Sequence, residues 1–211
     1  MEKQIATELR KLLKDAQRQF LSLHNNFPGK QPFSGIVRTN ALPCGSGSRI
    51  GGIYPTISRI NHSCLPNAHN SWDSASGHEN IYAVRFIGAG EEITISYDHG
   101  GPSDERRRHL KDAFDFDCDC SICSRQLDEL QQSDERGREI TRLDSEIGNA
   151  LRVLQSPKDC LKDCQVMLQI LEEEYEGSPG VHLVRLYYDA FQISIVHDDQ
   201  ARARALCRAV I

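Results

Sequence analysis

The pattern of apolar and polar positions changes twice along the chain and divides it into three stretches. From Glu2 to Phe27, apolar residues recur three or four positions apart and charged residues fill the gaps, which predicts one amphipathic helix. The apolar positions are Ile5, Leu9, Leu12, Leu13, Ala16, Phe20 and Leu23. The run Asn25-Asn26-Phe27-Pro28-Gly29 ends this helix, because Asn, Pro and Gly favour turns.

Between Phe33 and Tyr97 the helical period gives way to short β-type runs separated by Gly, Pro, Asn and Ser. In the last of these runs, Ile93 and Ile95 alternate with polar residues, the period of a half-buried strand, and Ala89-Gly90-Glu91 supplies a turn before it. Tyr97 then lies at the end of that strand. We expect strands at Gly35–Arg38, Ile81–Phe86 and Glu92–Ser96.

A capped helix start follows at Ser103, with Glu105 in the first turn, and predicts a helix that runs to about Phe114. This helix delivers a cysteine-rich run directly after its end. The charged run Arg106 to Arg108 is expected to form an exposed face of the helix.

From Ser124 onward the charge density is high and Leu and Ile recur at helical spacing, so this stretch should be all helix. The punctuating Pro, Gly and Asp residues give helices near 134–155, 158–175, 180–196 and 199–211. Helix pairs of this length suggest a helical-repeat tail, of tetratricopeptide-like type, although no matching repeat signature is found. The last helix has no closing cap, which indicates a chain cut within such an array.

Composition permits an ordinary globular protein, since 39% of the 211 residues are hydrophobic. The net charge of −5 argues against direct nucleic-acid binding and favours a basic peptide as partner. The N-terminal stretch is charged throughout, and no apolar run approaches the roughly 20 residues of a membrane span. We therefore expect a protein of the nucleus, the cytoplasm or both, with no membrane contact.

The chain has eight cysteines, which in a reducing compartment are thiols or metal ligands more often than disulfides. Cys118, Cys120 and Cys123 stand so close together that a zinc site is favoured over buried free thiols. A fourth ligand must come from elsewhere, and Cys64 and the neighbouring His62 are the candidates. The remaining cysteines, Cys44, Cys160, Cys164 and Cys207, are interpreted as buried or incidental.

Three motifs in this order resemble the SET-domain family with its post-SET zinc site. They are Asn-His-Ser-Cys-Leu-Pro-Asn at 61–67, Gly-Glu-Glu-Ile-Thr-Ile-Ser-Tyr at 90–97, and the Cys-x-Cys-x-x-Cys run. The segment Ile53 to Ser58, the short post-SET spacing and the helical tail are most similar to the SET and MYND branch and its fungal SET-only relatives. The resemblance also makes Cys64 the fourth zinc ligand.

The resemblance implies an α+β fold: a partial SET β-fold of short strands with a post-SET zinc site, an amphipathic helix before it and an all-α tail after it. The expected division is an N-terminal helix at 1–32, the C-terminal half of a SET domain at 33–101, a post-SET helix and zinc segment at 102–124, and the helical tail at 125–211.

The family also implies S-adenosylmethionine as cofactor and a lysine side chain of a protein or peptide as methyl acceptor. By position, Asn61 and His62 would contact the cofactor, Phe116 would cover its adenine, and Asn40 would meet its methionine portion. Tyr97 matches the active-site tyrosine and is also counted among the cofactor contacts. Since a phenol has a pKa of about 10, we expect this tyrosine to orient the amine instead of acting as a strong base.

Plainer roles stand beside these assignments. Tyr97 and Phe116 are also ordinary aromatic residues for a strand end and a core, and Asn61 and Asn67 are residue types that satisfy backbone groups in turns. The acidic pair Glu91 and Glu92 is interpreted as solvated or structural, because neighbours on a strand point to opposite faces.

The sequence before Phe33 contains no counterpart of the strand and glycine-rich loop that open a SET domain, so the N-terminal part of the domain is expected to be missing. Three functions follow. The first is a protein-lysine methyltransferase, with histone or non-histone substrates and so a link to chromatin, either active or made inactive by its shortened form. The second is a non-catalytic SET-like zinc module that binds a protein partner on its helical tail, and the third is a methyltransferase for another acceptor.

Overall fold

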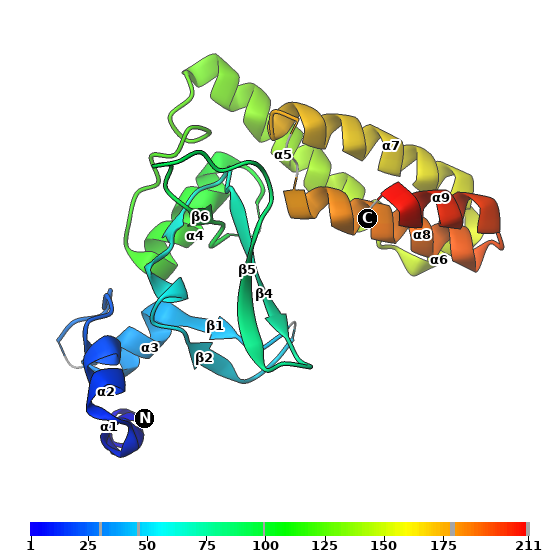
Figure 1. Cartoon of the computed structure of the whole chain (residues 1–211). Helices are drawn as coiled ribbons and strands as arrows, with labels where there is room; N and C mark the ends of the chain where they lie inside the picture. Colours follow the sequence, from blue (N-terminus) through cyan, green and yellow to red (C-terminus); the bar gives the residue numbers. More distant parts are fainter. Residues whose placement is uncertain (30, 46, 99, 178–179, 210–211) are drawn as a thin grey trace. The chain divides into compact units, whose positions relative to one another are not determined.

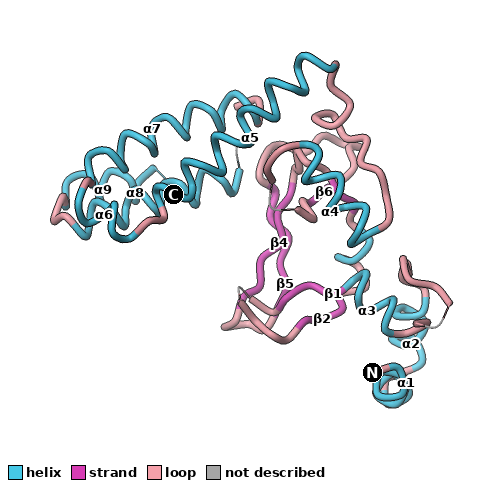
Figure 2. The backbone as a smooth tube through the Cα atoms, turned by 180° about the vertical axis from the view of Figure 1, so that it is seen from behind, coloured by secondary structure: helices cyan, strands magenta, loops and turns pink. Residues whose placement is uncertain are grey.

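A computed structural model describes residues 1–29, 31–45, 47–98, 100–177 and 180–209. Helices predominate, and the strands are few and short (Figures 1 and 2). The chain divides into two compact units, one made of Met1–Asp98 with Arg107–Cys118 and the other of His99–Arg106 with Asp119–Ile211. Within the described residues, no helix combines the length and the apolar character needed to cross a membrane.

The N-terminal stretch forms α1 (Glu2–Lys11) and α2 (Lys14–Leu21), so the prediction of one continuous helix is wrong. Leu12 is extended, with ψ of 159°, and its carbonyl accepts a bond of 2.8 Å from the Gln17 side chain. This break allows Leu9 of α1 and Phe20 of α2 to pack on the same small core, around Ile36. Tertiary packing therefore overrides the helical period at this point.

The expected strand at Gly35–Arg38 is instead the helix α3 (Ser34–Asn40). The backbone N–H groups at its start are capped by a residue far away in the sequence. The Glu2 carboxylate accepts hydrogen bonds from the N–H groups of Phe33 at 3.1 Å and Ser34 at 2.7 Å. A carboxylate at this end also complements the helix dipole. The local preference of the β-branched pair Ile36-Val37 for a strand is overridden by this cap.

The strands form three two-stranded sheets: β1 (Ala41–Pro43) antiparallel to β2 (Gly51–Ile53), β3 (Asn61–His62) parallel to β6 (Thr94–Ile95), and β4 (Ala68–Asp73) antiparallel to β5 (His78–Ala83). A 3-10 turn, η1 (Ile57–Arg59), leads into β3. The strand expected at Ile81–Phe86 exists but begins and ends earlier, with Phe86 exposed beyond it. The strand expected at Glu92–Ser96 is reduced to β6, because only Ile95 of its apolar residues is buried.

The predicted helix at Ser103 to Phe114 is confirmed as α4 (Ser103–Phe114). Its expected exposed face, Arg106 to Arg108, is wrong in one position: Arg107 and Arg108 are exposed, but Arg106 is buried. The Arg106 guanidinium donates a hydrogen bond to the carbonyl of Gly101, which gives this buried cation a partner.

The helical character of the stretch after Ser124 is confirmed for its described residues, as α5 (Leu127–Ile147), α6 (Ala150–Gln155), α7 (Pro157–Glu174), α8 (Gly180–Val196) and α9 (Gln200–Ala209). The first predicted helix, 134–155, is wrong, because α5 begins earlier and the chain breaks after Ile147. The Asn149 side chain accepts bonds from the N–H groups of Leu151 and Arg152 and so starts α6 as a new helix.

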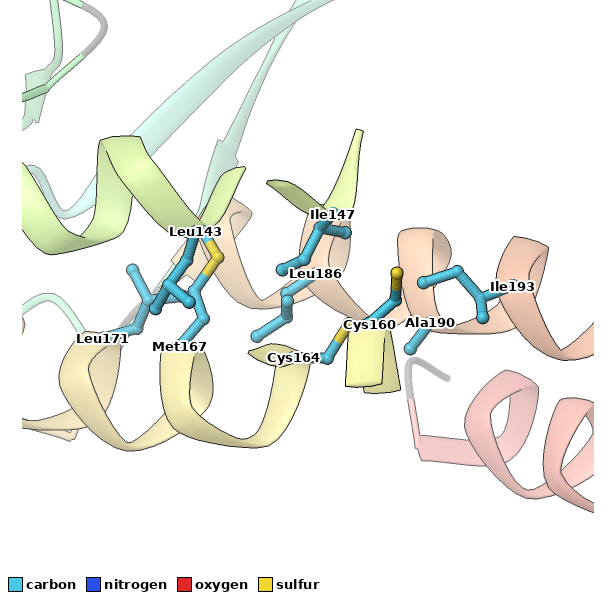
Figure 3. Packing of buried hydrophobic residues seen from close by; sticks show 9 residues of the cluster. All are labelled: Leu143, Ile147, Cys160, Cys164, Met167, Leu171, Leu186, Ala190 and Ile193. Carbon is cyan, nitrogen blue, oxygen red and sulfur yellow. The ribbon is translucent and has the colours of Figure 1, made fainter. Parts of the chain in front are cut away.

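The core of the second unit lies between α5, α7 and α8 (Figure 3). It consists of Leu143, Ile147, Cys160, Cys164, Met167, Leu171, Leu186, Ala190 and Ile193. Cys160 and Cys164 are buried, as expected, and burial raises the pKa of the Cys164 thiol to about 12, with the charge of Asp189 as the next cause. Cys164 therefore serves as a small apolar side chain of the core, whereas the Cys160 sulfur also accepts a 3.4 Å bond from the Arg152 guanidinium.

Candidate active site

The two SET-like motifs are held side by side by the parallel pair β3 and β6. Asn61 faces Thr94 and His62 faces Ile95 in the register, and the N–H of Ser63 donates a 3.0 Å bond to the Ile95 carbonyl. The pairing places Tyr97, two residues beyond β6, next to the His62 ring, at 5.4 Å between ring centroids.

Asn67 fixes the second motif against the first. Its fully buried amide donates to the Glu92 carbonyl at 2.8 Å and to the Glu91 carboxylate at 3.0 Å, and its oxygen accepts from the N–H of Thr94 at 2.9 Å. Asn67 thus satisfies backbone groups, as expected, but these belong to the distant second motif and not to a local turn.

Glu91 has a structural role as well, since it joins Arg85 and Asn67 to the turn before β6. Hydrogen bonds from the Arg85 side chain, then from the N–H of Gly88 and from Asn67, lower the pKa of Glu91 to about 2. The carboxylate is therefore charged at neutral pH and remains bound within this turn.

The two ring nitrogens of His62 contact different segments, the backbone at Tyr97 and the sulfur of Cys64. Its Nδ1 accepts a 2.9 Å bond from the backbone N–H of Tyr97, and its Nε2 lies 3.3 Å from the Cys64 sulfur. An imidazole that accepts at Nδ1 carries its proton at Nε2, so the ring donates toward the sulfur. This arrangement connects the backbone at Tyr97 with the cysteine site.

Tyr97 lies at the centre of an aromatic cluster formed by His62, Tyr97, Phe114 and Phe116. Its ring centroid is 4.9 Å from that of Phe114 and 6.4 Å from that of Phe116, and its hydroxyl donates to the Ile60 carbonyl. Burial, followed by the negative charge of Glu92, raises the pKa of the Tyr97 phenol. The side chain is therefore a neutral phenol at pH 7, with oxygen lone pairs available to a ligand.

The turn at the end of α4 places Phe116 in this cluster. Asp115 has a positive φ of 54°, a conformation that Asp tolerates at a helix end, and the Lys111 ammonium binds Asp115 at 3.1 Å and Asp117 at 3.3 Å. The ring of Phe116 then lies 5.9 Å from that of His62. Sequence reasoning missed Phe114, although its position two residues before Phe116 was a signal.

Asn40 and Asn61, the two asparagines predicted to bind the cofactor, make their hydrogen bonds to residues outside the aromatic cluster. The Asn61 amide donates to the Glu92 carboxylate at 2.6 Å, and the buried Asn40 amide donates to the carbonyls of His24 at 2.7 Å and Ile36 at 2.8 Å. Among the described residues, neither side chain has a hydrogen bond to the aromatic cluster. The carbonyl oxygen of each amide is the atom left to accept a bond from a ligand.

The four predicted cysteines converge. The sulfur atoms of Cys64, Cys118, Cys120 and Cys123 all lie within 4.8 Å of one another, and those of Cys64 and Cys118 are 4.0 Å apart. A tetrahedral zinc with Zn–S bonds of about 2.3 Å requires sulfur atoms about 3.8 Å apart. The set therefore has the chemistry and spacing to hold zinc, and it contains Cys64 in place of the alternative ligand His62.

A cation lies beside this set. Four thiolates around one Zn²⁺ carry a net charge of −2, which a buried site must offset. The Arg106 guanidinium lies 3.9 Å from the Cys123 sulfur and supplies a positive charge from its own buried position. This contact gives a reason for the burial of Arg106 that its sequence context did not reveal.

Comparison with known proteins agrees with this geometry. Residues 7–98 match the SET-domain family model. This part of the chain is therefore similar to the SET domain, and the predicted resemblance to that family is confirmed. The match begins within α1, includes α2 and extends through the motifs to just past Tyr97.

Curated relatives extend the likeness beyond residues 7–98. The chain is 31% identical over 204 residues to the histone-lysine N-methyltransferase set5 of Schizosaccharomyces pombe, covering 95% of this chain and 62% of the relative. It is 33% identical to mouse histone-lysine N-methyltransferase SMYD3, covering 59% and 29%, and 26% identical to zebrafish N-lysine methyltransferase SMYD2-B, covering 86% and 46%. The chain thus spans less than two thirds of the length of these relatives.

Proposed function

We propose that this chain is an S-adenosylmethionine-dependent protein-lysine N-methyltransferase. The observation that carries the proposal is the aromatic cluster, in which the neutral phenol of Tyr97 is held between His62, Phe114 and Phe116 at the junction of the two SET motifs. The relatives set5 and SMYD3 are named histone-lysine methyltransferases and SMYD2-B an N-lysine methyltransferase, which supports a lysine-containing protein as substrate.

The residues present suit the cofactor chemically. Phe116 offers an aromatic face for an adenine ring, Asn40 and Asn61 offer amide oxygens, and His62 packs against Tyr97. The cofactor supplies a methyl group on a cationic sulfonium, which the amine of the substrate attacks in line. The protein therefore has to position the amine and keep competing water away from the methyl group.

The aromatic cluster would also affect the protonation state of the substrate lysine. A lysine with a pKa of about 10.4 is neutral in only about one molecule in 2,500 at pH 7. Apolar rings around the amine, here Tyr97 and Phe114, disfavour its charged form and so lower that pKa. The Tyr97 hydroxyl already donates its proton to the Ile60 carbonyl, so its oxygen is left to accept from the amine and orient it.

The proposed zinc ion has a structural role. Cys118, once held with Cys64, fixes the segment that carries Phe116 two residues earlier in the chain. Since the ring of Phe116 packs on His62, an ordered cysteine set also keeps the proposed adenine face in place. No open coordination position is needed for this role.

Transfer of a labelled methyl group from S-adenosylmethionine to histones and to lysine-rich test proteins measures the proposed activity. Tyr97→Phe should bind the cofactor as the unsubstituted protein does and lose at least a hundredfold in transfer rate, about 2.7 kcal/mol of transition-state stabilisation. Tyr82→Phe is the matched control, because Tyr82 is exposed on β5 outside the cluster. Unchanged transfer by Tyr97→Phe would refute the proposal, and absence of cofactor binding would favour the non-catalytic zinc module.

A further inference from the structure

A separate pocket lies in the second unit, along α7, α8 and α9, and has a volume of about 510 Å³. Its lining includes four residues of the core shown in Figure 3: Cys164, Leu186, Ala190 and Ile193. A pocket of this size with an apolar floor is typical of a binding site. None of the residues assigned to methyl transfer lines it.

The lining residues show that the pocket is an elongated groove. On α7 they recur one helical turn apart, from Pro157 through Leu161 and Gln165 to Leu168. On α8 they extend from Leu186 to Ser194, and His197 follows just beyond the end of that helix. The α7 row spans twelve residues, or about 16 Å of helix, and the row that ends at His197 spans twelve residues of sequence as well. This is the length of three turns, the span over which an amphipathic helix presents apolar side chains at positions i, i+4, i+7 and i+11.

The positive charges gather at one end of the groove. The short connection between α7 and α8 makes them antiparallel neighbours, so the start of α7 meets the end of α8. His197 at the end of α8 accordingly bonds the Val153 carbonyl, just before α7, at 2.7 Å. Lys158 and Lys162 line this end, and Arg202 of α9 joins them.

These cations are available to a ligand. Lys158 has no ion pair with a described residue. Lys162 pairs with Asp159 at 3.1 Å and Arg202 with Asp199 at 3.6 Å, and such exposed pairs are weak enough for a ligand to replace. Of the acidic residues described, Asp199 alone lines the groove, so the lining carries a positive excess in a chain of net charge −5.

We propose that this groove binds an amphipathic helix of a partner protein, with three turns of apolar face and acidic residues at the end that meets Lys158, Lys162 and Arg202. The apolar floor takes the hydrophobic side chains, and the cations select and orient the acidic end. The interaction is independent of the proposed methyl transfer, so each can fail without the other.

The test uses the 211-residue chain and designed 16-residue helical peptides with leucines at i, i+4, i+7 and i+11, with binding followed by fluorescence anisotropy. One peptide carries its glutamates at one end, a second carries them at the other end, and in a third lysine replaces them. One of the two acidic orientations should bind at least tenfold more tightly than the other, and the lysine peptide should bind least.

Charge reversal identifies the groove as the site of binding. Arg202→Glu and Lys158→Glu should each weaken the preferred peptide at least fivefold, whereas Arg204→Glu, an exposed cation on the same helix outside the lining, should leave it unchanged. Equal loss in the Arg204 control, equal affinity for all three peptides, or binding of decanoate in preference to any peptide would overturn the proposal.

Discussion

Glu174 is a buried carboxylate whose replacement should measurably destabilise the helical unit. It lies at the end of α7 with only 6% of its side chain exposed. It accepts bonds from Arg136 at 2.7 Å, from Arg125 at 3.2 Å and from the Ser133 hydroxyl at 2.6 Å. Glu174→Gln keeps the shape of the side chain and removes the charge that the two guanidinium groups face.

The structure sets the magnitude of this effect. Removing one member of a fully buried ion pair costs about 3–5 kcal/mol. Arg125 and Arg136 keep side-chain exposures of 14% and 23%, and Arg125 retains Glu176 as a partner at 3.1 Å, so the lower end of that range applies. We expect a loss of about 3 kcal/mol in the free energy of unfolding, or about 6–12 °C in Tm.

Urea unfolding followed by circular dichroism at 222 nm measures the loss by linear extrapolation. Glu173→Gln is the matched control, because the neighbouring Glu173 is exposed and the same substitution there should change stability by no more than about 0.5 kcal/mol. A loss for Glu174→Gln no larger than that of the control would refute the reasoning from burial and geometry.

Three further outcomes are expected. Because the pKa of Glu91 is lowered to about 2, its stabilising contribution is present above about pH 4.5 and lost as the pH falls toward 2. In acid unfolding over this range, the free energy of unfolding of Glu91→Gln should therefore depend less on pH, whereas Glu8→Gln should keep the pH dependence of the unsubstituted protein. Gly137→Ala should lower Tm despite better helix propensity, because the added Cβ would lie 3.0 Å from a backbone carbonyl carbon; a higher Tm would contradict the close packing. Cys120→Ser should abolish stoichiometric zinc by elemental analysis, whereas Cys207→Ser, at an exposed cysteine, should retain it; equal zinc in both would contradict the four-cysteine site.

The sequence predicts helices with their own local caps and periods better than it predicts the short strands. α4 is predicted with both its ends, although the N–H and hydroxyl of Ser103 donate to the distant Asp134 carboxylate and form no local cap. α3 is mistaken for a strand because its cap, Glu2, comes from more than thirty residues away. β3 and β6 each have two residues, too few for a period, and exist through their pairing with each other.

The candidate site likewise combines residues that the sequence predicts with contacts that it does not predict. The cysteine set and Tyr97 follow from motifs of the resemblance, and the structure brings each into a cluster. The contacts of His62 with both Tyr97 and Cys64 were not predictable, because they depend on the orientation of one ring between two segments. The burial of Arg106 was missed for a similar reason: its contacts with the Gly101 carbonyl and the Cys123 sulfur depend on how the chain folds and carry no local sequence signal.

Calorimetric titration of the zinc-loaded chain with S-adenosylmethionine tests the central claim most directly, since it requires no choice of substrate. We predict saturable one-to-one binding that Phe116→Ala weakens at least tenfold, about 1.4 kcal/mol, and that Phe86→Ala, at an exposed phenylalanine outside the aromatic cluster, leaves unchanged. Absence of binding by folded, zinc-containing protein, or equal binding by both variants, would contradict the assignment of this cluster as the cofactor site.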